Sequence, residues 1–229
     1  MTLSEKHQNF LSRFAKPDLH YSFEDAPLPY IRNTHNINDI AEKYITHNNK
    51  NIIKELAKNP NLNHTFINTL LDYPDPVVRR AVILNKNITS ENIDKALNDG
   101  DDYVRANAIS NPNAKNEHFN KALLDQNSVK RAAAANPVIP MHHLDNLVND
   151  DNEFVRWATA INPNIQHYHL DKLLTDKSAF VSACAASSNN CNKQHIRYAL
   201  NDIRENVRQS ASFNVKTKEY YPEEYTGMF

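Results

Sequence analysis

Glycine and cysteine are scarce in this sequence, and long hydrophobic runs are missing. The 2 glycines among 229 residues, Gly100 and Gly227, exclude a glycine-rich loop that would cradle a phosphate. The 2 cysteines, Cys184 and Cys191, are too few for a disulfide framework or a cysteine-rich metal centre. Both occur where small apolar residues recur, which predicts buried thiols in preference to a disulfide or a metal pair. We therefore expect no cofactor.

No stretch of the chain approaches the roughly 20 apolar residues that cross a bilayer. The first ten residues, MTLSEKHQNF, have no apolar core of the kind found in signal peptides. We therefore expect a cytoplasmic protein without membrane association. The net charge is −1 and the pI is about 6.8, a balance that argues against nucleic acid as the partner.

An internal repeat dominates the chain from about residue 37 onward. A β-branched apolar residue returns with steps of 26, 26, 25, 26, 26 and 26, at Ile52, Val78, Val104, Val129, Val155, Val181 and Val207. Seven positions after each comes an asparagine, with Ser188 as the exception: Asn59, Asn85, Asn111, Asn136, Asn162 and Asn214. A fixed period of this length is typical of a stacked, quasi-one-dimensional architecture.

Each repeat predicts two short helices joined at an Asn-Pro corner. Apolar or small residues stand at the repeated Val and three and four positions later, which is one face of a first helix. A second apolar set, with anchors such as Phe119 and Leu170, has the same helical spacing. Acidic residues just upstream, such as Asp75, Asp101 and Asp151, suit a helix N-terminus, and the proline after the asparagine suits its end. We expect an all-α, right-handed α-solenoid of about seven repeats of 25–26 residues.

Three segments follow from this pattern. Residues 1–36 predict an N-terminal helix and an extended segment, and residues 37–214 predict the repeat domain. In the Val207 repeat, Pro222 falls where the second helix needs its apolar anchor, so we expect no second helix there. Residues 215–229, a tyrosine-rich tail, are expected to cap the last repeat or to dock on a partner, and we favour the cap.

The unit D-x-x-V-R-x-A-x-A-x-N-P followed by L-x-x-L-L-x-D resembles the variant leucine-rich repeats of bacteria, which belong with HEAT and armadillo arrays. Residues 101–112 (DDYVRANAISNP) and 151–163 (DNEFVRWATAINP) carry the first part, and 144–150 (LDNLVND) and 170–176 (LDKLLTD) carry the second. The resemblance implies a HEAT-like superhelix and a binding role in a bacterial or phage protein, with no named partner. The period is slightly longer than in that family, which leaves open whether the second helix is α or 3-10. The iron–sulfur cysteines of one family member have no counterpart here.

The asparagine column should be structural. An unpaired amide on the buried face would cost roughly 1–3 kcal/mol. We therefore predict that these side chains bond to backbone groups at the corner of their own or the next repeat.

Two columns are candidates for partner binding. A basic column follows the repeated Val, at Arg79, Arg105, Lys130, Arg156 and Arg208. It predicts either an anion-binding stripe or a ladder of ion pairs with the upstream acids, and we favour the ladder. Aromatic residues lie beside it, at Tyr103, Phe154, Trp157 and Phe180, where they suit either a partner groove or packing between repeats.

A histidine column precedes the anchor of four second helices, at His118, His143, His169 and His195. Helices packed about 8–10 Å apart do not bring such residues to one metal ion, so we expect no metal site. The column predicts either tolerated residues at the edge of the buried face or a pH-sensitive surface.

The favoured function is a non-enzymatic scaffold that binds another macromolecule, in first place a protein, through equivalent positions of successive repeats. One alternative is a HEAT-like DNA-binding protein or DNA glycosylase, with Asp150 or Asp151, Arg156 and Trp157 as its site; the net charge argues against it. Another alternative is an effector or inhibitor encoded by a phage or mobile element. The oligomeric state and the binding face stay open at this stage.

Overall fold

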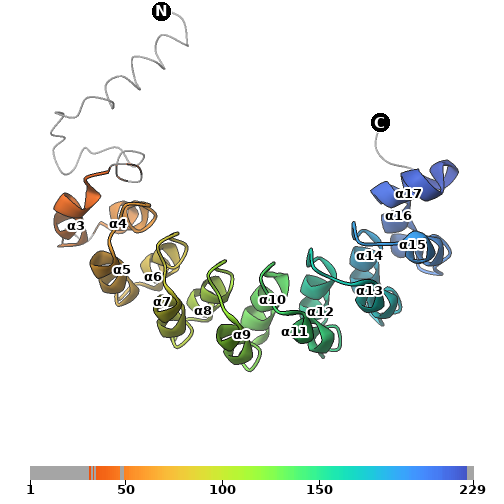
Figure 1. Cartoon of the computed structure of the whole chain (residues 1–229), viewed down its shortest axis with the longest axis horizontal. Coiled ribbons are helices and arrows are strands. Elements are labelled where there is room, and N and C mark those ends of the chain that lie inside the picture. The colour runs from red at the N-terminus through yellow and green to blue at the C-terminus, as the bar shows by residue number, and fades with distance from the viewer. Residues whose placement is uncertain (1–30, 32, 34, 47–48, 226–229) are drawn as a thin grey trace, which may run out of the picture. The chain divides into compact units, whose positions relative to one another are not determined.

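The computed structural model describes residues 31, 33, 35–46 and 49–225, and within these ranges the chain is entirely helical. These residues contain 15 α-helices and one 3-10 helix, and within each unit described below a second helix packs on the first helix that follows it, for example α5 on α6 and α13 on α14 (Figure 1). The predicted all-α solenoid of two-helix repeats is therefore confirmed. The helix expected near the N-terminus lies in residues 1–30, outside the described residues.

The chain divides into two compact units, Met1–Ile88 and Thr89–Phe229. The helices of unit 1 are α3 (Ile37–Thr46), α4 (Lys50–Ala57), α5 (His64–Leu71) and α6 (Pro76–Val82). Unit 2 begins with α7 (Ser90–Ala96), α8 (Asp102–Ile109), α9 (Asn116–Ala122), α10 (Asn127–Ala135) and α11 (Met141–Leu147). It continues with α12 (Glu153–Ala160), α13 (His167–Leu174), α14 (Ala179–Ala186), α15 (Lys193–Leu200), α16 (Glu205–Phe213), α17 (Val215–Tyr220) and the 3-10 helix η1 (Pro222–Glu224).

First helices and second helices form separate rows in unit 2. The first helices α8, α10, α12, α14 and α16 pack closely on one another, and the second helices α9, α11, α13 and α15 lie along the other side (Figure 1). The second helices are α-helical over seven or eight residues, which answers the question that the repeat length left open.

The repeated Val forms the centre of each repeat's core. The Val side chains from Val104 to Val207 are fully buried, together with the second-helix anchors Phe119, Leu144, Leu170 and Ile196. Alanines dominate the remaining buried positions of the first helices, for example Ala133 and Ala134 in α10, and their small side chains allow the close packing of that row.

The asparagine column joins each repeat to the one before it. Asn162 is buried, and its side-chain N–H groups donate to the carbonyls of Ala134 and Asn136 at 2.6 and 3.1 Å. Its Oδ1 accepts from the N–H of Asn164 at 2.8 Å, which closes the corner of its own repeat. Within each unit, side-chain N–H bonds to the preceding repeat are also made by Asn59, Asn85, Asn136 and Asn214. Asn111, likewise buried, accepts from the N–H of Asn113 at 2.9 Å.

Acidic residues between repeats shape the start of each first helix, although not always as N-caps. Asp75 and Asp101 accept hydrogen bonds from N–H groups of α6 and α8, as expected for N-caps. The expectation for Asp151 is wrong, because Asn152 caps α12. Asp150 and Asp176 lie earlier and accept from the N–H two residues onward, at 2.9 and 2.8 Å.

The C-terminal segment differs from the sequence prediction. A second helix does follow α16: α17 begins directly after Asn214, which caps it through the N–H of Lys216. The helix starts at the corner itself, at Val215, and ends before Pro222. Tyr220 and Tyr221 are partly buried against the hydrophobic core of unit 2. The segment therefore covers the end of that core.

Candidate functional site

The basic column is occupied by contacts within the protein. Arg156 donates from Nε and Nη2 to both carboxylate oxygens of Asp176, at 2.6 and 2.9 Å. Its Nη1 donates to the carbonyls of Asp150 and Asp151 at 2.7 and 3.0 Å. The side chain is only 4% exposed, which removes it from the surface available to a partner.

The other members of this column make related contacts. Arg105 forms the same bidentate pair with Asp125, at 2.7 and 2.9 Å, and Lys130 reaches Asp150 at 3.2 Å. Arg79 and Arg208 donate to carbonyls at the end of the preceding second helix: those of Tyr73 and Pro74, and those of Asp202 and Ile203. The column therefore forms a ladder of contacts between and within repeats.

The acids of the ladder are held ionised by these contacts. The guanidinium of Arg105 holds the pKa of Asp125 below its ordinary value. Burial opposes the ionisation of Asp176, yet hydrogen bonds from Arg156 and Ser178 outweigh it and also lower its pKa. The charges of the basic column are thus neutralised by contacts within the protein, and these side chains do not form an anion-binding stripe.

The histidine column lies inside the protein, and not at the edge of the buried face. All four rings are at most 5% exposed. In three second helices Nδ1 accepts a hydrogen bond from the N–H of the N-cap residue, at 2.8 Å in His118 and at 3.1 Å in both His169 and His195. The ring is thus the third helical residue of a capping box, which leaves the proton of the neutral ring on Nε2.

The Nε2 atoms of these rings face the preceding second helix. His169 faces Asp145 at 2.8 Å and His195 faces Asp171 at 2.9 Å. His118 lies 3.4 Å from Asp94, and its Nε2 is also 3.3 Å from the hydroxyl of Ser90. Each imidazole therefore links two repeats.

His143 departs from this arrangement. Its N-cap residue is Pro140, which has no N–H to donate, and its Nε2 faces Asn116 at 3.0 Å in place of a carboxylate. Burial lowers the pKa of His143, and the neighbouring ring of His142 adds to that effect. Burial also lowers the pKa of His195, against the opposing influence of Asp171. The fold thus favours the neutral form of both rings.

The first helices of unit 2 expose several aromatic and aliphatic side chains. We call this surface the first-helix face and define it by Tyr103, Arg131, Phe154, Trp157, Ile161 and Phe180. Tyr103 is 57% exposed, Phe154 50% and Phe180 47%. Phe154, Trp157 and Ile161 are spaced i, i+3 and i+7, so they lie on one stripe of α12. Arg131 is the only charged residue among these six.

Trp157 connects two repeats on this face. Its ring stacks on Phe180 of α14, with the centroids 5.9 Å apart and the planes at 25°. The ring also contacts Cys184: burial raises the pKa of that thiol, and a hydrogen bond with Trp157 opposes the rise. Trp157 is thus partly a packing residue, whereas about half of Phe154 and half of Phe180 face solvent.

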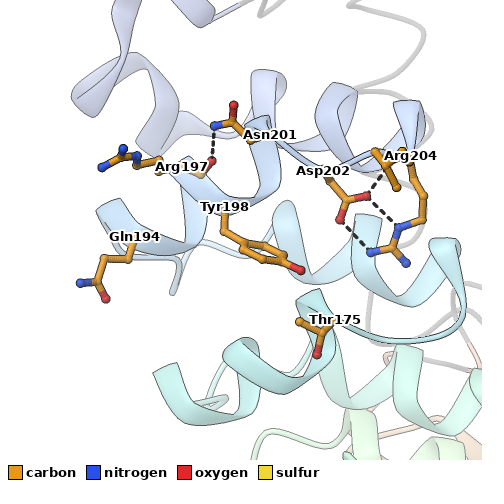
Figure 2. Close-up of a pocket in the computed structure, with 8 residues that line it drawn as sticks. Thr175, Gln194, Arg197, Tyr198, Asn201, Asp202 and Arg204 are labelled. Atoms are coloured by element: carbon orange, nitrogen blue, oxygen red, sulfur yellow. Dashed lines mark hydrogen bonds and ion pairs between the residues drawn. The ribbon is translucent and has the colours of Figure 1, made fainter.

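The clefts in unit 2 are open and are lined by both polar and apolar surface. One of about 720 Å³ lies between α13 and α15 (Figure 2), where Tyr198 extends toward Thr175 and the Asp202–Arg204 pair lines the opposite part. A second cleft, of about 760 Å³, lies at the corners near Asn164, Asn190 and Tyr220. A third, of about 460 Å³, lies between α11 and α13.

The residues suggested for a glycosylase-like site make other contacts in the structure. Arg156 is buried and bonded to Asp176, Asp150 pairs with Lys130, and Trp157 stacks on Phe180. None of Asp150, Asp151, Arg156 and Trp157 lines the three clefts described above.

The remaining titratable groups offer little chemistry. Both cysteines are unpaired, and burial raises the pKa of Cys191 to about 12. Among the described residues, no three His, Cys, Asp or Glu side chains gather in a way that would hold a metal ion. The described helices also include none with the length and apolar character that crossing a membrane requires.

Comparison with known proteins identifies a solved structure with a similar fold. No protein-family model matches the chain, and no curated protein matches its sequence. A solved structure described as "a leucine-rich repeat variant with a novel repetitive protein structural motif" is similar, with a TM-score of 0.60 and 18% sequence identity. The similarity covers 93% of this chain and 87% of the other. The resemblance predicted from the repeat unit is thereby confirmed at the level of the fold.

Proposed function

We propose that this protein is a non-enzymatic repeat scaffold that binds another protein through the first-helix face of unit 2. The observation that carries the proposal is the exposure of Phe154 and Phe180 on adjacent repeats, beside Trp157. Neighbouring aromatic side chains that stay exposed are typical of protein interfaces, where they supply most of the binding energy.

The exposed side of the second helices is more polar, which supports the proposal. Its exposed aromatic residues are tyrosines, and the hydroxyl of Tyr168 donates to Asp145 at 2.7 Å. Charged residues such as Lys172 and Arg197 surround them. The second helices thus present a solvated surface, and the first helices present the apolar one.

Charge supports a protein partner over nucleic acid. Residues 89–229 contain 15 Lys and Arg against 18 Asp and Glu, a net charge of −3. Arg105 and Arg156 are already paired with carboxylates and would have to break those pairs to reach a phosphate.

Photo-cross-linking in the native host tests this proposal. A photoreactive phenylalanine analogue replaces Phe154 or Phe180 on the first-helix face, or Tyr168 or Tyr198 on the second-helix side as matched controls. We expect one protein adduct at Phe154 and Phe180 that the unlabelled chain competes away, and none at the tyrosines. Adducts only at the tyrosines, or adducts with nucleic acid, would contradict the proposal.

Substitutions in the basic column are unsuitable for this purpose. Arg105→Glu or Arg156→Glu would place a carboxylate beside Asp125 or Asp176 in a partly or fully buried position. Such variants would report on folding, because an uncompensated buried charge costs several kcal/mol, roughly 3–5.

A further inference from the structure

An acidic residue, Glu153, lies beside the aromatic residues of α12 on the first-helix face. Glu153 and Trp157 are four residues apart in α12, and Phe154 and Trp157 are three apart, so the three side chains are neighbours on one side of the helix. Phe180 joins them from α14 through its stacking on Trp157. We call these four residues the α12–α14 cluster.

Glu153 is held at this cluster by the next repeat. The hydroxyl of Ser178 donates to its Oε2 at 2.6 Å, across the same helix pair that the Trp157–Phe180 stack connects. The carboxylate keeps its remaining acceptor sites for another donor, because an ionised carboxylate accepts about four hydrogen bonds. The neighbouring Arg156 does not compete for it, since that guanidinium is bound to Asp176.

We infer that the α12–α14 cluster binds an arginine or lysine side chain of an extended segment in a partner protein. A cation above an aromatic ring is attracted by the electron-rich face, most strongly at tryptophan. A carboxylate at the edge of the same rings accepts the donated hydrogen bonds. The exposed Phe154 and Ile161 receive the aliphatic part of the segment. This inference rests on the proposed function and adds the chemistry of the partner.

Charge around the cluster agrees with a basic segment. Asp151 and Glu153 are exposed at the start of α12, and Glu205 is exposed at the start of α16. The ladder acids between these positions are paired. Among the exposed charged residues of α10, α12, α14, α16 and the turns directly before them, these three carboxylates stand against two cations, Arg131 and Lys177. A basic segment would approach these carboxylates favourably, and its rate of binding would fall with added salt.

The test is selection of binding peptides from a random dodecapeptide library displayed on phage, with the full chain as the bait. Selected peptides are synthesised with a fluorescent label, and their affinities are measured by anisotropy for wild type and variants. We expect peptides enriched in arginine or lysine beside an apolar residue. Glu153→Gln and Trp157→Leu should each weaken binding tenfold or more, and citrulline in place of the peptide's arginine should do the same.

Asp151→Asn is the matched control, because it removes an exposed carboxylate two residues from Glu153 and should change the affinity less than twofold. Glu153→Gln keeps an acceptor for Ser178, so the variant should unfold at the wild-type temperature. Equal losses in Asp151→Asn and Glu153→Gln would indicate diffuse charge attraction and overturn the inference.

The other possible results distinguish a failure of the inference from a failure of the proposed function. Peptides without an excess of basic residues that lose affinity in Phe154→Ser and Phe180→Ser would overturn the inference and support the first-helix face. Peptides unaffected by every substitution on that face would overturn both. Recovery of no specific peptide would overturn the inference, and the cross-linking experiment would then decide the proposed function by itself.

Discussion

Arg204 makes the contacts that Ser182 is too short to make. In the repeats of Arg105 and Arg156, the arginine after the repeated Val donates to a carbonyl six residues earlier and to a carboxylate twenty residues later. Position 182 carries serine, whose hydroxyl reaches the carbonyl of Asp176 at 3.3 Å. Arg204 donates to that same carbonyl at 2.7 Å and binds both carboxylate oxygens of Asp202 at 2.8 Å.

This relationship predicts a compensating pair of substitutions. Arg204→Ala should lower the free energy of unfolding by about 1–3 kcal/mol, because it removes the guanidinium donors of the Asp202 carboxylate and of the Asp176 and Leu174 carbonyls. Ser182→Arg introduced into Arg204→Ala should recover at least half of that loss. Urea denaturation of wild type, both single variants and the double variant measures the coupling.

Ser182→Arg alone is the control for this cycle. Ser182 is fully buried and the Asp202 carboxylate is already occupied, so the added guanidinium should not stabilise the wild-type chain. Additive effects of the two substitutions would show that Arg204 does not replace the missing arginine.

The ladder also predicts that arginine-to-lysine and lysine-to-arginine substitutions change stability in opposite directions. Arg156→Lys should destabilise unit 2 by about 1–3 kcal/mol, because an ammonium cannot make the bidentate pair with Asp176 or the carbonyl bonds together with it. Lys130→Arg should change stability in the opposite direction, since Lys130 makes only one contact with the Asp150 carboxylate, at 3.2 Å. Thermal unfolding of both variants measures this, and a loss of stability in Lys130→Arg would contradict it.

The asparagine column predicts a stabilising substitution at its one exception. Ser188 accepts from the N–H of Asn190 at 3.2 Å but makes no side-chain bond to the preceding repeat of the kind that Asn162 makes. Ser188→Asn should place its N–H groups near the carbonyls of Ala160 and Asn162, the equivalent positions. We expect a gain of about 0.5–1.5 kcal/mol, one typical hydrogen bond.

Ser187→Asn provides the comparison for that variant. Position 187 is exposed at the end of α14, so asparagine there should change stability by less than about 0.5 kcal/mol. Chemical denaturation of the two variants separates a specific bond from a general effect of asparagine. Equal stabilities would show that the gap at Ser188 does not weaken the stack.

The repeat period made most of the fold predictable, because each buried column follows from spacing alone. Val155, Asn162 and Leu170 lie where the helical face requires. The exceptions were not predictable in the same way. Arg204 stands outside the basic column, and its role depends on a side chain reaching back 28 residues to Asp176. The sequence prediction missed helix α17 because it assumed that the apolar anchor of a second helix lies as far from the asparagine as in the other repeats. In the structure, α17 begins directly after Asn214.

The proposed binding surface was less predictable than the fold, because exposure on a helix depends on tertiary packing. The sequence placed Arg156 and Phe154 in equally regular columns. Only the structure shows that Arg156 is buried between repeats and Phe154 faces solvent. The histidine column is a similar case, since the N-cap contact of Nδ1 requires the position of the chain three residues earlier.

The buried histidines predict a loss of stability on acidification. The pKa of His195 is lowered in the folded protein, so this ring is neutral in both states at pH 7.5. As the pH falls below about 6.5, the ordinary histidine pKa, the unfolded ring takes up a proton before the folded ring does. Folding must then keep the ring neutral or break its Nδ1 contact with Asn192, so the free energy of unfolding decreases as the pH falls.

His195→Asn tests the role of this ring, because Asn92 occupies the same place in α7 and its Oδ1 accepts from the N–H of Thr89 at 3.1 Å. The variant should retain the cap and lose part of the difference in stability between pH 5.0 and pH 7.5. His64→Asn removes an exposed ring at the start of α5 and should leave that difference unchanged. Urea denaturation at both pH values makes the comparison. If His195→Asn and wild type lose equal stability on acidification, the cause lies in other titratable groups, because a neutral amide at position 195 cannot take up the proton that the imidazole does.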